Sequence, residues 1–140
     1  MTGRTTMLDT NVVSELLRVG GSAAVARFVA ELPAPLLSVA VFHELGYGVD
    51  LLSFGARKAR MSSNIETIRR QFTNCIVEVD ATIARLSGEL RARVQLRGGE
   101  LKPIDALIAA SALTRTALLA TRNLRHFQDL GIDLVNPWDA

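Results

Sequence analysis

The stretch TTMLDTNVVSEL, residues 5–16, decides the expected fold. In it, a short apolar run is followed by one acidic residue and then by a helical pattern. Thr6–Leu8 is expected to form a buried strand, and a helix is expected from about Asn11 to Arg18, where a Gly-Gly pair ends it. Asp9 therefore follows the first strand directly. Its charge needs an explanation, since an unpaired buried charge is costly.

The rest of the chain alternates short apolar strands with helical segments. Further strands are expected at PLLS (35–38), CIVEV (75–79), TALLAT (116–121) and LV (134–135). Helices are expected from Ser22 to about 32, from Ser38 as N-cap to about 53, over 56–72, from Asp80 as N-cap to 96, and from Pro103 through IDALIAASALTR. Strands joined by helices predict parallel pairing through crossovers. The sequence thus predicts a single α/β domain over residues 1–140, a three-layer α/β/α sandwich with a mainly parallel central sheet of about five short strands.

Size and composition indicate an ordinary globular protein. The chain has 140 residues, 49% of them hydrophobic and 21% charged, which is enough to build a core. The net charge of +2 permits contact with an anionic partner without demonstrating one. The single Cys75 is expected at the start of a buried strand, where no disulfide within the chain is possible. No stretch has the pattern of a signal peptide or membrane span, so a cytoplasmic protein with no membrane association is expected.

Four acidic residues stand in apolar surroundings: Asp9 in MLDTN, Glu44 in VFHEL, Asp50 in GVDLL and Asp105 in PIDALIAA. Glu44 is expected on the helix face that meets the sheet, whereas Asp50 is expected to reach solvent and drops out. Each of the other three has a structural explanation. Asp9 could cap the following helix, Glu44 could pair with an internal Arg, and Asp105 could satisfy the amides that begin its helix.

Three such carboxylates together suggest a metal site. A cluster of carboxylates repels itself and takes up protons unless a cation holds it together. His43 and His126 have no zinc-like spacing, and oxygen ligands select a hard ion, so Mg2+ or Mn2+ is the natural candidate. Such an ion can activate water and stabilise charge on a phosphate. The implied chemistry is phosphodiester hydrolysis.

Five segments, in this order, resemble a known family: LDTNVVSEL, SVAVFHELGYGV, PIDALIAASA, ATRNLRHF and the VNPW ending. The chain resembles the PIN-domain ribonucleases over its whole length, and most closely the VapC-type toxins and their FitB-like relatives. The resemblance implies that Asp9, Glu44 and Asp105 bind Mg2+ or Mn2+ and position a hydrolytic water. It also implies an endoribonuclease toxin inhibited by a cognate VapB-like antitoxin, and a homodimer that can form a heterotetramer or larger assembly with it.

Several further residues are expected to support the three acids. Asn123 stands where the family often has Asp; it offers a carbonyl oxygen but no charge, so we expect one firm metal site. Thr121 could hydrogen-bond a metal-bound water, and Asn11 is expected to order the Asp9 loop. Basic residues near the same end, which could contact RNA phosphates, are Arg122, Arg125 and His126. A second basic set on the middle helices comprises Arg57, Lys58, Arg60, Arg69 and Arg70.

Three alternatives stay open at this point. A haloacid-dehalogenase-like phosphatase would use Asp9 as nucleophile, but its second acid would fall at position 11, which is Asn. A receiver-like phosphoacceptor would use the pair Lys102 and Pro103, but that pair should follow a strand and here follows a loop. A catalytically weak PIN interaction module is favoured by Asn123 alone.

Overall fold

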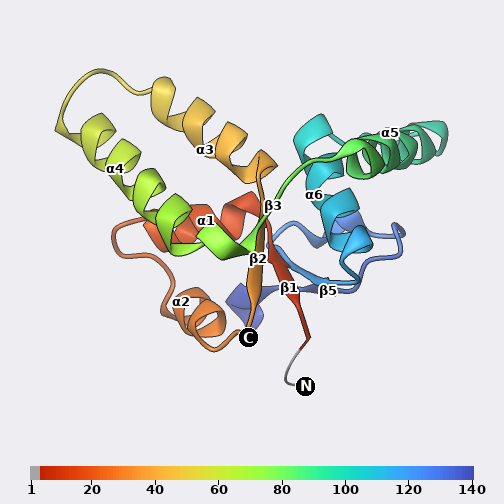
Figure 1. Cartoon of the computed structure of the whole chain (residues 1–140), viewed down its shortest axis with the longest axis horizontal. Coiled ribbons are helices and arrows are strands. Elements are labelled where there is room, and N and C mark those ends of the chain that lie inside the picture. Colours follow the sequence, from red (N-terminus) through yellow and green to blue (C-terminus); the bar gives the residue numbers. More distant parts are fainter. Residues whose placement is uncertain (1–3) are drawn as a thin grey trace.

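The computed structural model describes residues 4–140 and has a parallel sheet at its centre, with helices on both sides (Figure 1). The strand order is β3-β2-β1-β4-β5, and every pair is parallel. The strands are β1 (Thr6–Leu8), β2 (Pro35–Ser38), β3 (Ile76–Val77), β4 (Leu118–Ala120) and β5 (Leu134–Val135). The predicted five-stranded α/β/α sandwich is confirmed.

The helices divide into two groups around the sheet. They are α1 (Thr10–Leu17), α2 (Ala23–Ala30), α3 (Ala40–Asp50), α4 (Ala56–Gln71), α5 (Ala81–Leu96) and α6 (Pro103–Thr114). In Figure 1, α1 to α4 lie to the left of the strands, and α5 and α6 lie to the right. Within the described residues, no helix is both long and apolar enough to cross a membrane.

Helix starts follow the capping residues read from the sequence. The Asp9 side chain accepts a hydrogen bond from the Thr10 amide, and the Ser22 hydroxyl accepts one from the Val25 amide. Asp80 caps α5 in the same way, and Pro103 opens α6. A side-chain acceptor replaces the helical bond that these first amides lack.

Several predicted boundaries were wrong. α3 starts one residue later than expected: Ser38 is the last residue of β2 and Val39 is the N-cap, although the Ser38 hydroxyl still accepts a hydrogen bond from the Ala40 amide at 3.1 Å. Cys75 is not in a strand but in the 3-10 turn Thr73–Cys75, partly buried, because β3 is an edge strand that pairs with β2 through only two residues. β4 starts later than expected because Thr116 turns the chain with a φ of 51°.

The core is built around β1 and α6. β1 lies between two partners, and its Met7 and Leu8 are fully buried. α6 is apolar on nearly every side. It contacts α5, α3 and the three strands β1, β2 and β4, with Ile108 and its neighbouring alanines fully buried. This packing fixes the start of α6 beside the carboxyl ends of the strands.

Candidate active site

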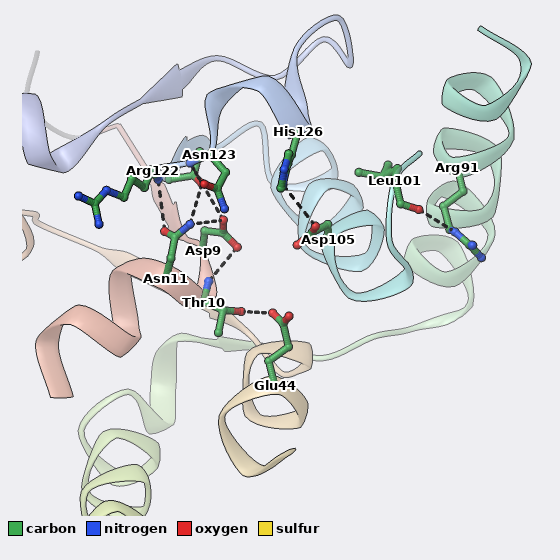
Figure 2. Close-up of polar contacts among 11 residues, drawn as sticks. Asp9, Thr10, Asn11, Glu44, Arg91, Leu101, Asp105, Arg122, Asn123 and His126 are labelled. Carbon is green, nitrogen blue, oxygen red and sulfur yellow. Dashed lines mark hydrogen bonds and ion pairs between the residues drawn. The ribbon is translucent and has the colours of Figure 1, made fainter. Parts of the chain in front are cut away.

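The three predicted carboxylates lie at the carboxyl ends of the strands and line one pocket of about 440 Å³. Asp9 follows β1 directly, Glu44 is on α3, which begins just after β2, and Asp105 is in the first turn of α6. Parallel strands bring their carboxyl ends to the same edge, where sites form in open α/β sheets. Figure 2 shows the three side chains around this opening. By contrast, Asp50 is exposed, as expected.

Asp9 is the most tightly held of the three. Its side chain is only 3% exposed. One carboxylate oxygen, Oδ1, accepts from the Thr10 amide at 2.8 Å, and the other, Oδ2, accepts from the Thr121 hydroxyl at 2.6 Å. The Asp9 amide also donates to the Ala120 carbonyl at 2.9 Å. The carboxylate is therefore held both by the start of α1 and by the residue that follows β4. The same side chain caps α1 and lines the pocket.

Thr10 joins two of the carboxylates. Its amide donates to Asp9, and its hydroxyl donates to Glu44 Oε1 (Figure 2). Glu44 is partly buried and, among residues 4–140, forms no ion pair with an arginine, so the pairing considered for it is not what holds it. One residue thus orients two acids that lie far apart in the sequence. Sequence analysis did not identify Thr10.

A second network connects the loop after β4 to α1. The Thr121 hydroxyl is fully buried; it donates to Asp9 and accepts from the Asn123 amide at 3.0 Å and from Asn11 Nδ2 at 3.4 Å. The Asn11 side-chain oxygen Oδ1 accepts from the Arg122 amide at 3.3 Å. Thr121 therefore orients Asp9 rather than facing the open pocket. Asn123 is exposed at the rim and lines the pocket.

The third acid, Asp105, has a histidine neighbour. His126 Nδ1 lies 3.8 Å from Asp105 Oδ2, and the Asp105 side chain is 18% exposed. His126 comes from the 3-10 turn Leu124–Phe127 after β4, so this turn overhangs the start of α6 (Figure 2). His126 and Lys102 both line the pocket beside the acids.

The acids raise one another's proton affinity. Burial raises the pKa of Asp9 to about 6, and the charges of Asp105 and Glu44 add to the rise, while hydrogen bonds from Thr121 and Thr10 oppose it. Burial also raises the pKa of Asp105, followed by repulsion from Glu44, against the opposing charges of His126 and Lys102. The pocket therefore concentrates negative charge in a setting that a cation would stabilise.

The donor set fits a hydrated hard cation. The pocket offers carboxylate oxygens and the Asn123 amide, without a thiol ligand. Among residues 4–140, no three acidic, histidine or cysteine side chains stand close enough to form a ready-made metal cluster. Mg2+ and Mn2+ suit such a set, because an ion that keeps part of its water shell needs few direct protein ligands. Asp9, Asp105 and Glu44 would hold it, some of them through water.

The predicted basic residues do not all line the acidic pocket, although Arg122, Arg125 and His126 share a shallow hollow beside it. Arg122 lies beside the acids, with its guanidinium carbon 4.7 Å from the centre of the Trp138 ring, whereas Arg125 does not line the acidic pocket. In the second set, Arg57 and Arg60 line a neighbouring groove between α1 and α4. The other three residues of this set do not line that groove. Lys58 lies over the Phe54 ring, Arg69 forms an ion pair with Glu66, and Arg70 is exposed on α4.

Sequence analysis missed Trp138, which lines the acidic pocket. The signal was present in VNPW, because β5 ends at Val135 and runs parallel to β4, so the residues that follow both strands emerge at the same edge. The Asn136 side chain accepts from the Trp138 amide at 3.0 Å, and Pro137 is buried. These two residues place the indole at the pocket.

Known proteins resemble this chain over nearly its full length. It is similar to the plasmid stability protein StbB of Pseudomonas syringae pv. tomato, at 33% identity over 137 residues, covering 96% of this chain and 99% of StbB. It is also similar to the VapC ribonuclease Y4jK of Sinorhizobium fredii, at 29% identity over 136 residues, covering 95% and 97% of the two chains.

A third relative and a solved structure come from the same organism. The toxin FitB of Neisseria gonorrhoeae is 31% identical over 135 residues, covering 94% of this chain and 97% of FitB. The crystal structure of FitAcB from Neisseria gonorrhoeae superposes with a TM-score of 0.86 at 30% identity, covering 96% of this chain and 99% of the matched chain. The PIN domain family matches residues 6–132. With this match and these relatives, the chain belongs to the PIN-domain family.

Proposed function

We propose that this protein is a divalent-metal-dependent endoribonuclease that hydrolyses phosphodiester bonds in RNA and acts as the toxin of a toxin-antitoxin pair. The observation that carries the proposal is the meeting of Asp9, Glu44 and Asp105 in one pocket, where burial and mutual repulsion raise the pKa of two of them. Two relatives support it by name, a VapC ribonuclease and the toxin FitB.

The proposed chemistry divides between the ion and the protein. Bound Mg2+ or Mn2+ supplies a Lewis acid that favours hydroxide formation from water and neutralises charge on the phosphate. The chain itself contributes orientation. Thr121 and Thr10 hold Asp9, Thr10 also holds Glu44, and the first turn of α6 presents Asp105. Asn123 adds an oxygen without charge at the rim, so we propose one firm metal site.

Charge around the pocket suits a phosphate backbone. Arg122 and His126 line the pocket beside the acids, and Arg125 follows on the neighbouring surface. Cations at these positions would attract RNA and keep its backbone near the metal-binding acids. We propose these three residues as RNA contacts of the enzyme.

The phosphatase alternative loses its support, because the chain belongs to a different family. The phosphatase would also need an acidic residue at position 11, whereas Asn11 is uncharged and its side chain is hydrogen-bonded to Asp9 and Thr121. The receiver-like alternative fails as well, because Lys102 precedes a helix and follows a loop. A weakly catalytic PIN module is the second candidate, and the uncharged Asn123 is the observation that favours it.

A cleavage assay separates the enzyme from the inactive module. Purified protein is incubated with cellular RNA and Mg2+ or Mn2+, beside the variants Asp9→Asn and Asp105→Asn. Asp50→Asn serves as the matched control, since Asp50 is exposed on α3. The proposal expects cleavage by the native chain and the control only. Absence of metal-dependent cleavage, together with equal toxicity of native and Asp105→Asn chains in cells, would contradict it.

We also propose a VapB-like antitoxin partner and a homodimer, and larger assemblies when both interactions occur. A partner arginine could occupy the acidic pocket in place of metal and substrate, as charge-assisted bonds to two acids would be strong. Tyr47, Leu51 and Phe54 are large apolar side chains exposed near the end of α3 and are suited to an interface between copies. If pull-down and light scattering show that the protein from native cells is a monomer with no bound protein, both the antitoxin partner and the homodimer would be contradicted.

A further inference from the structure

The guanidinium of Arg122 lies over the Trp138 ring at the edge of the acidic pocket. Both residues line the pocket together with Asp9, and the Arg122 guanidinium lies 4.7 Å from the centre of the Trp138 ring. The two come from different strand ends, Arg122 just after β4 and Trp138 in the 3-10 turn after β5. Because β4 and β5 are parallel neighbours, the fold brings these residues together at the edge that carries the acids.

Both partners are held in place by hydrogen bonds of the main chain. The Arg122 amide donates to Asn11 Oδ1, and Asn11 Nδ2 donates to Asp9, so the backbone of Arg122 is tied to the metal-binding carboxylate. The Trp138 amide donates to Asn136 Oδ1, and the ring packs against the core. The pair therefore keeps a fixed position relative to Asp9.

The direction of Arg122 separates it from the other basic side chains. Figure 2 shows its side chain extending away from Asp105 and His126, on the opposite side of Asp9. Arg122 is exposed and, among residues 4–140, forms no salt bridge within 4 Å. Its guanidinium is thus available to a ligand while its stacking on the indole restricts its orientation.

We propose that Arg122 and Trp138 form a stacking subsite for one unpaired nucleobase of the RNA strand, next to the phosphate that is cleaved. An exposed guanidinium plane backed by an aromatic ring matches the way proteins hold splayed bases of single-stranded RNA. This inference rests on the proposed ribonuclease function and adds to it the placement of a base. It gives Arg122 a role that depends on its planar shape, whereas a phosphate contact depends on charge alone.

Trp138 permits a direct test because it is the only tryptophan in the chain. The Asp9→Asn variant is titrated with short single-stranded oligoribonucleotides while tryptophan emission is recorded and binding is followed separately by anisotropy of a labelled oligonucleotide. Abasic oligonucleotides of the same length serve as the charge-only probe. The subsite predicts that emission changes on binding of the RNA and not on binding of the abasic strand.

Substitutions separate shape from charge. Arg122→Lys keeps the charge and the main-chain bond to Asn11 but removes the planar group, and it should weaken RNA binding roughly tenfold with the salt dependence unchanged. Arg115→Lys is the matched control, because Arg115 is exposed at the end of α6 that lies away from the acids. In the otherwise native chain, Arg122→Lys should raise KM for RNA cleavage while kcat stays within about twofold.

Three results would overturn the subsite. RNA that binds without changing tryptophan emission, together with equal affinities of Arg122→Lys and Arg115→Lys, contradicts the subsite and leaves the ribonuclease intact. Equal emission changes with RNA and the abasic strand reduce Arg122 to a phosphate contact. An emission change with a protein partner but none with RNA assigns the pair to that partner. A chain that neither binds nor cleaves RNA would overturn the proposed function itself.

Discussion

The buried carboxylate of Asp9 should make the metal-free protein lose stability as pH rises. Its pKa is raised from 3.8 to about 6, first by burial and then by repulsion from Asp105 and Glu44. Between these two values the folded state binds more protons than the unfolded chain, so the free energy of unfolding falls as pH increases. A shift of about two pKa units corresponds to about 3 kcal/mol.

The variant Asp9→Asn isolates this effect. Asparagine carries no charge, so it lacks the pH-dependent loss, but with its oxygen facing the Thr10 amide its Nδ2 cannot accept the bonds that Thr121 and Asn11 donate to Asp9 Oδ2. That cost is independent of pH. We therefore predict that stability of the variant relative to the native chain rises by about 3 kcal/mol between pH 3.5 and 7.5, with most of the change between pH 4 and 6.

Urea denaturation in EDTA, followed by circular dichroism at several pH values, measures this difference. Asp105 titrates in both chains, so most of its contribution cancels. Asp50→Asn is the control for the chemical change, as Asp50 is exposed on the same protein, and its curve should run parallel to the native one. If the curve of Asp9→Asn is also parallel to the native curve, the buried carboxylate does not carry the electrostatic cost assigned to it.

Other predictions test the ion, the hydrogen bonds and the packing. Mg2+ at about 100 times its dissociation constant should stabilise the native chain by about 2.7 kcal/mol in a thermal melt; an Asp105→Asn chain that gains as much would exclude this acid from the ion site. Thr121→Val should cost roughly 1.5–3 kcal/mol in urea, because a buried hydroxyl donor to a carboxylate is lost, whereas Thr121→Ser should retain most of the stability. Gly21→Ala should destabilise by about 1–3 kcal/mol, because its Cβ would lie 2.4 Å from the Glu15 carbonyl oxygen. Gly88→Ala, at an open position in α5, should instead stabilise by up to about 1 kcal/mol, and similar melting temperatures for the two alanine variants would contradict the packing argument.

The fold was largely predictable because its signals are local. Asp9, Ser22 and Asp80 each precede a helical pattern, and each was found as a side-chain cap. The boundaries that failed depend on tertiary pairing. The length of β3 is set by where β2 ends, and the start of β4 is set by a turn in which Thr116 has a left-handed conformation. That conformation is not predicted from the sequence, because threonine rarely adopts a positive φ.

The acidic residues of the site could be predicted from the sequence, but the hydrogen bonds and ring contacts around them could not. Charges in apolar surroundings identified Asp9, Glu44 and Asp105, because burial of a charge is costly and must serve a purpose. Thr10 and Trp138 escaped notice, since a threonine at a helix start and a tryptophan near the chain end are common features. Their roles arise from contacts with residues far away in the sequence, which only the folded chain specifies.

The sheet order has a consequence for the timing of activity during protein synthesis. β1, which Asp9 follows directly, is flanked by β2 and β4, and the residues that complete the site, Asp105 and Thr121, come much later in the sequence than Asp9. At the usual 5–20 residues per second, a ribosome needs about 5–20 s to advance from Asp9 to Asp105. A nascent chain therefore lacks an intact centre until Asp105 and Thr121 have been synthesised. Under the proposed function, a toxin built in this order is harmless while it is being made, and a neutralising partner has that interval to be present.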